Sequence, residues 1–406
     1  MVLRLFNTLG RAKQEFKQTK GSAVKLYTCG PTVYAYQHIG NYRTYIFEDT
    51  LKRVLLLNGY KTRHIMNITD VGHLTSDADE GDDKIAQAAI RQHKTAFEIA
   101  RLYEEAFKSD LKTLNIIAPT KYVRATDHIK EQIKLVQTLE KKNYTYKTSD
   151  GIYFDTSKLK DYGKLAPRSI HGLRAGKRIG IGEKRNPTDF ALWKFSPAAE
   201  SGEARLPISS RRQMEWPSPW GIGFPGWHIE CSAMCMKYLG STLDIHCGGA
   251  DHVQIHHTNE IAQSEAATGK PFSKFWMHAA FLTIRGERMA KSSPETNIII
   301  ATLRERGFNP LDFRYLALGT HYRKPLSFSW DALSGARISR LKILQTFVSL
   351  HKKSTKLDAA LKKQFLEAIN DDLNTSRTLA IFWQGLKQNA SQDFVLWCDT
   401  LLGLNI

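Results

Sequence analysis

Between residues 24 and 71 the chain alternates strand and helix patterns. Residues 24–28 form an apolar, β-prone run that stops at the chain-breaking residues 29–31. From residue 41 to residue 57, apolar side chains recur at helical spacing, and Asn58-Gly59 ends this pattern. Residues 61–71 form a second β-prone run. A strand, a helix and a strand in this order make a βαβ unit, which predicts a parallel sheet covered by helices.

Strand and helix patterns return in the second half of the chain. We expect a helix over 226–239, a strand over 242–246 and a helix over 252–268, which would complete the same sheet. Between the two halves, residues 156–186 and 195–226 are rich in loop-forming residues. From residue 331 to the end the pattern is helical. The sequence therefore predicts an α/β fold followed by a small helical domain.

The composition points to a polyanionic partner in a reducing compartment. The chain has 406 residues, with 58 Lys and Arg against 40 Asp and Glu and a net charge of +18. Nucleic acid is the first partner that such a charge suggests, and an anionic membrane is the second. No apolar run approaches the roughly 20 residues that cross a bilayer, so we expect no membrane association. Five cysteines in so long a chain do not make a disulfide framework, and we expect a cytoplasmic protein.

Two short motifs have the composition of phosphate sites. His38-Ile39-Gly40-Asn41 lies where a strand ends and a helix begins, so its backbone N–H groups and the helix dipole would favour an anion. An ordinary N-terminal helix turn would give the same residues. The loop 288–293 carries Lys291, which could neutralise a leaving polyphosphate, and a solvated surface loop is its alternative interpretation.

Several residues are of the types that bind metals. Cys29 ends the first strand, Cys231 lies in the helix over 226–239, and His256 and Glu260 share one helix face because they are four residues apart. Two thiolates, an imidazole and a carboxylate would suit a tetrahedral zinc ion. Cys235 and His257 are equally well placed in sequence, so the spacing leaves rival ligand sets, and buried structural cysteines are a further alternative.

The order of these motifs closely resembles that of the cysteinyl-tRNA synthetases, which are class I aminoacyl-tRNA synthetases. The matching residues are 27–34, 38–41, 67–70, 225–234, 244–251, 256–264 and 289–292. The resemblance implies a Rossmann-type catalytic domain with an inserted connective segment, followed by a small all-α domain. It predicts the first half of the catalytic domain over 1–120, the insertion over 121–215, the second half over 216–325 and the helical domain over 326–406.

The resemblance also implies the reaction. The enzyme would activate L-cysteine with ATP and Mg²⁺ as cysteinyl-adenylate, and would then transfer cysteine to the 3′ adenosine of tRNA-Cys. We expect a monomer. The chain ends at Ile406 without a counterpart of the family's C-terminal anticodon-binding domain. We therefore expect that domain to be absent or vestigial, which leaves open how the anticodon is read.

Site residues follow from the resemblance, position by position. One zinc ion per chain would be bound by Cys29, Cys231, His256 and Glu260, which decides against Cys235 and His257. The zinc would take the thiolate of the substrate, because soft sulfur binds zinc better than the hydroxyl of serine does. The residues expected to bind the amino acid are Thr69, Trp227, Asp251 and the nearby His246. Those expected to bind ATP and to act in catalysis are His38, Gly40, Asn41 and Lys291.

The chain departs from the family pattern at a few positions. Asn41 stands where many class I enzymes have His, and Arg288 and Ala290 alter the lysine loop around Lys291. Cys247 and His252 replace Gly and Leu, and Phe224 stands where Arg usually precedes Pro-Gly-Trp. The basic segment 156–186, with nine Lys and Arg against two acidic residues, could contact tRNA phosphates or could be a solvated loop.

Two other functions are compatible with parts of this pattern. A relative could pass activated cysteine to a small-molecule amine, as the mycothiol cysteine ligases do, but residues 31–34 and the positive charge favour a tRNA enzyme. A non-catalytic zinc- and RNA-binding paralogue is the second alternative. Retention of His38, Asp251 and Lys291 together with the four metal ligands argues against it.

Overall fold

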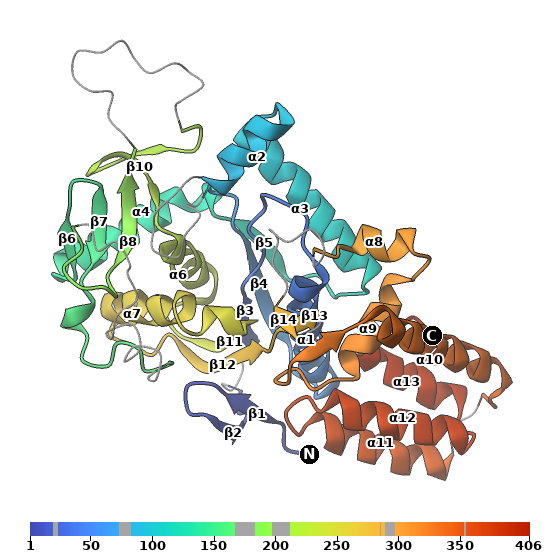
Figure 1. Cartoon of the computed structure of the whole chain (residues 1–406). Coiled ribbons are helices and arrows are strands. Elements are labelled where there is room, and N and C mark those ends of the chain that lie inside the picture. Colours follow the sequence, from blue (N-terminus) through green and yellow to red (C-terminus); the bar gives the residue numbers. More distant parts are fainter. Residues whose placement is uncertain are drawn as a thin grey trace.

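The computed structural model describes residues 1–18, 23–72, 83–166, 183–196, 212–284, 286–288, 297–352 and 355–406. Figure 1 shows a central sheet with a smaller sheet on one side and a group of helices at the C-terminal end on the other. This arrangement agrees with the predicted α/β catalytic domain, its insertion and a helical domain.

The central sheet has five parallel strands in the order β12-β11-β3-β4-β5. They are β3 (Val24–Thr28), β4 (Thr62–Ile68), β5 (Lys121–Arg124), β11 (Leu243–Gly249) and β12 (Ser273–Ala279). From β3 the strand order runs outward through β4 to β5, and on the other side through β11 to β12. In open α/β sheets such a reversal leaves a crevice at the carboxyl ends of the two central strands, where ligands bind. Here that crevice lies between β3 and β11.

Helices cover both faces of this sheet. α1 (Ile39–Leu57) and α3 (Ala96–Thr113) share one apolar core with Leu26 of β3. The other core contains Tyr27 of β3 and side chains of α4 (Ile129–Lys141), α6 (Trp227–Leu239) and α7 (His256–Thr268). Leu26 and Tyr27 enter different cores because successive side chains of a strand point to opposite faces.

The insertion contains a second sheet, whose strands are all antiparallel and lie in the order β6-β7-β8-β10-β9. Its strands are β6 (Thr145–Lys147), β7 (Gly151–Phe154), β8 (Phe190–Phe195), β9 (Trp216–Ser218) and β10 (Gly221–Pro225). The prediction of a loop over 195–226 is therefore wrong for the residues that form the strands β9 and β10. The predicted insertion over 121–215 also has different limits, because β5 pairs with β4 in the parallel sheet and β10 continues to Pro225.

Smaller elements connect and flank the two sheets. The chain begins with the hairpin β1 (Arg4–Asn7) and β2 (Ala12–Glu15), which the sequence patterns did not reveal. α2 (Lys84–Gln92) precedes α3, and the 3-10 turns Thr126–His128, Thr156–Lys158 and Ala250–His252 lie in loops. α4 starts directly after His128, whose side chain makes no capping hydrogen bond.

The C-terminal part is helical, as predicted. It begins with a short sheet whose strands are β13 (Leu282–Ile284), β14 (Glu287–Arg288) and β15 (Leu326–Phe328). Between β14 and β15 the chain forms the helices α8 (Ile300–Glu305) and α9 (Pro310–Leu318). Four further helices follow: α10 (Trp330–Ser349), α11 (Lys356–Ile369), α12 (Thr375–Lys387) and α13 (Gln392–Leu402).

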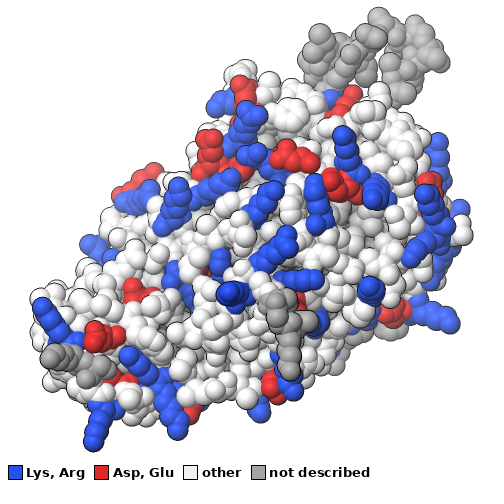
Figure 2. All heavy atoms as spheres, turned by 180° about the vertical axis from the view of Figure 1, so that it is seen from behind, with Lys and Arg blue, Asp and Glu red and all other residues white. Residues whose placement is uncertain are grey.

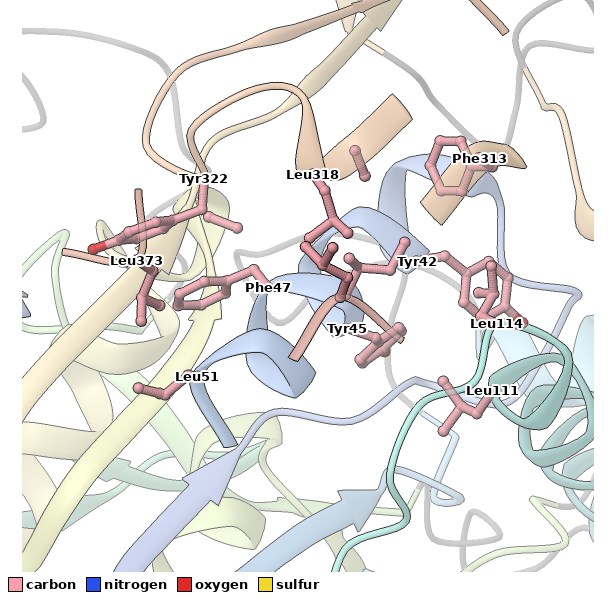
Figure 3. Close-up of a cluster of buried hydrophobic side chains, with 14 of the residues drawn as sticks. Tyr42, Tyr45, Phe47, Leu51, Leu111, Leu114, Phe313, Leu318, Tyr322 and Leu373 are labelled. Carbon is pink, nitrogen blue, oxygen red and sulfur yellow. The ribbon is translucent and has the colours of Figure 1, made fainter. Parts of the chain in front are cut away.

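One continuous core joins these helices to the parallel sheet. Figure 3 shows Phe47 of α1 beside Tyr322 and Leu373 from the C-terminal part, and the Phe47 and Tyr322 rings stack with centroids 4.4 Å apart. Also on α1, the buried Asp49 accepts hydrogen bonds from Arg53 at 2.7 Å and from Arg314 at 2.5 Å. Burial alone would raise the pKa of Asp49, but Arg314 and Arg53 lower it below its usual value. The helical region is therefore fixed to α1.

Basic side chains dominate the surface seen from behind. Figure 2 shows Lys and Arg spread over that whole face, with Asp and Glu fewer and interspersed. The excess positive charge is thus not confined to the predicted basic segment, of which residues 167–182 lie outside the described residues. None of the helices in the described part of the chain has the length and hydropathy needed to span a bilayer.

Candidate active site

A pocket opens at the crevice between β3 and β11. Cys29 follows β3, and Asp251 follows β11 in the turn that leads to α7. The pocket and the open solvent at its mouth together take up about 850 Å³. Seven residues predicted from the sequence line it together: Cys29, Asn41, Thr69, Trp227, Cys231, Asp251 and His256. The topology thus brings segments from both halves of the chain to one cavity.

Four side chains of metal-binding type meet at the floor of this pocket. One ligand atom from each of Cys29, Cys231, His256 and Glu260 lies within 4.8 Å of all the others, and all four residues are buried. Cys231 comes from the first turns of α6, while His256 and Glu260 stand one turn apart on α7. A group of two sulfurs, one imidazole and one carboxylate in so small a volume fits a tetrahedral metal site.

The contacts of Glu260 test whether a cation fits there. Its Oε1 atom is buried without a hydrogen bond of good geometry, although Nε2 of His256 lies 3.0 Å away. An oxygen and a nitrogen that lie this close without a well-formed hydrogen bond are expected where both atoms would coordinate the same ion. The other oxygen, Oε2, lies 3.0 Å from Nε2 of the fully buried His246. His246 therefore orients the carboxylate from behind, as outer partners of metal ligands do.

A second donor set shares part of this cluster. Cys29, His246, His257 and Glu260 also offer ligand atoms within 4.8 Å of one another. Sγ of Cys29 lies 3.2 Å from Nε2 of His257, whose Nδ1 lies 2.7 Å from Nε2 of His278. Both ring nitrogens of His257 thus have partners inside the protein. Cys235 is in neither set, and burial raises the pKa of its thiol.

The charges in the cluster favour anionic ligands. The neighbouring Cys29 lowers the pKa of the Cys231 thiol to about 7. Burial would raise the pKa of Glu260, but His246 and His256 lower it to about 2. Burial would likewise lower the pKa of His256, but Glu260 and Cys231 raise it to about 10. The site thus stabilises a carboxylate and a thiolate beside positive charge, as a bound cation would require.

The walls of the pocket come from the loop after β4, the first turn of α6 and the turn after β11. Thr69 follows β4, and its Oγ1 accepts a hydrogen bond from Nδ2 of Asn67 at 3.0 Å. The Trp227 ring at the start of α6 lies 4.5 Å from the His256 ring, measured between centroids. Asp251 is exposed at the mouth of the pocket. An amino acid bound over the cysteines would therefore have an aromatic wall on one side and a carboxylate above it.

The predicted phosphate motif forms the start of α1. Nδ1 of His38 accepts a hydrogen bond from the backbone N–H of Asn41 at 3.2 Å, and Oδ1 of Asn41 accepts one from the N–H of His38 at 3.3 Å. This reciprocal pair is a capping box, in which the two side chains satisfy backbone donors of the first turn. Asn at position 41 thus keeps the turn rigid and also lines the pocket. His38 itself is buried beside it.

The match with known proteins covers most of the chain. Residues 15–338 match the family model described as tRNA synthetases class I (C) catalytic domain. Cysteine–tRNA ligase 1 of Burkholderia lata is 50% identical over 390 residues, which cover 96% of this chain and 80% of that protein. Cysteine–tRNA ligase of Treponema denticola is 48% identical over 84% of this chain and 67% of its own length. The chain belongs to the cysteinyl-tRNA synthetases.

A solved structure supports the fold. Methionyl-tRNA synthetase of Mycobacterium tuberculosis in complex with methionyl-adenylate has a TM-score of 0.62 and 16% sequence identity, covering 94% of this chain and 89% of that chain. At this identity the likeness concerns the fold. As a cysteinyl-tRNA synthetase, the protein is a ligase and a class I aminoacyl-tRNA synthetase, so the family and the Rossmann-type fold expected from the motifs are both confirmed.

Some predicted residues of this cysteinyl-tRNA synthetase are not at the pocket surface. His246 and Glu260 are fully buried and do not line the pocket, and Gly40 is in the first turn of α1. Lys291 and Ala290 lie outside the described residues, which stop at Arg288 and resume at 297. Cys247 is fully buried in the apolar core shared with α1, and burial raises the pKa of its thiol. Cys247 is in neither donor set.

Other residues of the site were not predicted. Tyr34, Gln37, Thr44, Tyr45 and Lys84 also line the pocket. His252, one of the departures from the family pattern, packs its ring 5.2 Å from that of His256 between centroids. His228 contacts His256 from the side of α6. These residues carry no local signal, because only the fold brings their segments to the same cavity.

Proposed function

We propose that the protein joins L-cysteine to tRNA-Cys in two steps, with cysteinyl-adenylate as the intermediate. The observation that carries this proposal is the buried group of Cys29, Cys231, His256 and Glu260 at the floor of a pocket between β3 and β11. Its soft sulfur donors lie at the place where open α/β sheets bind ligands. A pocket of this kind suits a small thiol-bearing substrate.

The four ligands are best suited to one zinc ion per chain. Two thiolates and an imidazole select zinc over the harder magnesium and calcium ions. When bound, zinc would supply a soft contact that favours the thiolate of cysteine over the hydroxyl of serine. Shape alone discriminates poorly between these two amino acids, so such a contact would remove the need for a second, editing site.

The remaining pocket residues would hold and orient the substrates. Asp251 would bind the ammonium group of cysteine, and Thr69 and Trp227 would enclose its backbone and side chain. The capped turn of His38, Gly40 and Asn41 would hold ATP phosphates, with Mg²⁺ bound to the nucleotide. The turn is already rigid through its capping box. Little proton transfer is then needed, and positioning accounts for most of the rate.

The chemistry follows from this placement. The cysteine carboxylate attacks the α-phosphorus of ATP, the bond to the β-phosphate oxygen breaks, and pyrophosphate leaves. Lys291 would neutralise the developing charge on that leaving group. A ribose hydroxyl of the terminal tRNA adenosine then attacks the carbonyl carbon of the adenylate, and AMP leaves. The broad positive surface would attract the tRNA backbone. The free cysteines of the described chain suit the reducing cytoplasm.

Cysteine-dependent exchange of pyrophosphate into ATP tests the first step. We expect exchange with cysteine and a rate lower by orders of magnitude with serine. Charging of a tRNA-Cys transcript, compared with a transcript whose GCA anticodon is altered, tests the second step. Exchange without any charging would favour a small-molecule amine as acceptor. A folded, zinc-loaded sample without exchange would contradict the proposal.

A further inference from the structure

We propose that Arg212 is a positioning residue that sets the amino-acid pocket by joining its two walls. This inference rests on the proposed function and goes beyond it, because Arg212 lines no part of the pocket. We use the term Arg212 clasp for Arg212 with Gly72, Asp83, Met214 and Phe224. Its members come from the loop after β4, the start of α2 and the inserted sheet.

The guanidinium group of Arg212 contacts all of these segments at once. Its central carbon lies 3.4 Å from the centroid of the Phe224 ring in β10. Nη2 lies 2.9 Å from Oδ2 of Asp83 and also donates to the carbonyl oxygen of Gly72. Nε donates to the carbonyl oxygen of Met214 at 3.0 Å. A planar guanidinium can stack on a ring and hydrogen-bond in its own plane, which a lysine cannot do.

The clasp is closely packed and shielded from water. The side chains of Arg212 and Asp83 are each 11% exposed, and Phe224 is buried. A Cβ atom on Gly72 would lie 2.0 Å from Oδ2 of Asp83, so only glycine lets the carboxylate approach. Asp83 also caps α2 by accepting hydrogen bonds from the N–H groups of Ile85 and Ala86. An ion pair with this little exposure is screened less than a surface pair.

Each clasp segment continues directly into the pocket. Phe224 precedes Trp227 by three residues, Gly72 follows Thr69 by three, and Asp83 adjoins Lys84. Trp227, Thr69 and Lys84 all line the cavity. The bridge between Gly72 and Phe224 thus sets the distance between the Thr69 wall and the Trp227 wall. These are the walls expected to hold the amino acid, whereas the capped turn at His38 and Asn41 lies on α1.

A loosened clasp should therefore weaken amino-acid binding while leaving ATP binding intact. We would measure cysteine-dependent pyrophosphate exchange for the full chain with Arg212→Ala. We expect the KM for cysteine to rise about tenfold, the scale of a partly buried cation–π and ion-pair contact, with kcat within about threefold. The KM for ATP should not change. Arg212→Lys, which keeps the charge but loses the stack, should lie between wild type and Arg212→Ala.

Arg185→Ala is the matched control. Arg185 precedes β8 and also stacks on an aromatic ring, that of Tyr146 in β6 at 4.2 Å, and pairs with Asp155 at 3.7 Å, but it adjoins no pocket residue. It should leave both KM values unchanged.

The possible failures can be told apart. Wild type without cysteine-dependent exchange would remove the proposed function itself. An active wild type with a folded Arg212→Ala or Arg212→Lys variant of unchanged cysteine KM would overturn the clasp alone. Equal rises in the KM values for cysteine and ATP would also overturn it, because they would indicate general damage. If Arg212→Ala does not fold, the Arg212→Lys result decides.

Discussion

Nδ1 of His228 lies 3.0 Å from Nδ1 of His256, inside the protein and beside the cysteine cluster. Because one of two facing nitrogens must donate and the other accept, this contact couples the protonation states of the two rings. With a metal ion bound, His256 would donate its Nδ1 proton to His228 and present an unprotonated Nε2 beside Glu260. That is the form in which a histidine binds a metal ion.

His228→Phe should weaken metal binding without removing a ligand. We expect zinc affinity to fall about 10- to 100-fold, the usual effect of losing an outer partner of a ligating histidine. Competition with a coloured chelator measures this directly. His128→Phe is the matched control, since His128 is also buried with two hydrogen bonds, to Arg124 and Tyr238, but lies outside the pocket. Equal affinities in wild type and His228→Phe would contradict the assigned role.

Loss of a ligand should have a larger effect. Cys29→Ser or His256→Ala should reduce zinc from about one ion per chain towards none and abolish cysteine activation at the same time. Cys235→Ser removes a buried cysteine one turn beyond Cys231 that is in neither donor set, and should keep the metal. Elemental analysis of the purified variants gives the zinc content. Full zinc in Cys29→Ser, or its loss in Cys235→Ser, would show that the ligand set is wrong.

Lys291→Ala should separate catalysis from binding. We expect adenylate formation to slow by about 100-fold or more, the scale of one lost charge contact to the transition state, while the affinity for cysteine barely changes. Single-turnover formation of cysteinyl-adenylate at saturating cysteine measures the rate, and equilibrium binding of cysteine provides the comparison. A large loss of cysteine affinity with a normal rate would contradict the role given to this lysine.

The buried Asp49 network predicts a pH-dependent contribution to stability. Arg314 and Arg53 hold the pKa of Asp49 below its usual 3.8, so its stabilising effect is present above that pH and is lost as the pH falls further. Asp49→Asn should lower the free energy of unfolding by about 3–5 kcal/mol at neutral pH, because it leaves buried guanidinium groups unpaired. The difference from wild type should shrink in acid.

Denaturant unfolding of wild type and Asp49→Asn between about pH 7 and pH 3 checks this. Asp371→Asn is the control, because Asp371 pairs with Lys13 at the surface with side chains 43% and 44% exposed. Its loss should cost less than about 1 kcal/mol at any pH. A difference between wild type and Asp49→Asn that grows as the pH falls would have the opposite sign to that expected.

The central strands and helices could be predicted because their patterns are local. The runs at β3 and β4 and the helical periodicity of α1 each lie within one segment. β9 and β10 could not be found in this way, because Gly and Pro interrupt them. Gly223 is needed in β10 since a Cβ atom there would lie 2.0 Å from the carbonyl oxygen of Lys194 in the neighbouring strand. Close backbone approach thus replaces the usual strand composition.

The site shows the same limit. His256 and Glu260 could be paired from their spacing on one helix, but Cys29 and Cys231 lie in distant segments that only the sheet topology unites. Their selection over Cys235 and His257 came from the resemblance to a known family. Partners such as His228 and Arg212 act through contacts between segments, and neither spacing nor composition reveals such contacts.

The most direct test replaces the zinc with cobalt(II), whose absorption reports thiolate ligands, and adds each amino acid in turn. We expect cysteine to strengthen the sulfur-to-cobalt charge-transfer absorption, because its thiolate joins those of Cys29 and Cys231, and we expect serine to leave the spectrum unchanged. A spectrum that does not respond to cysteine, in a protein that still activates cysteine, would contradict the claim that this buried cluster recognises the substrate thiol.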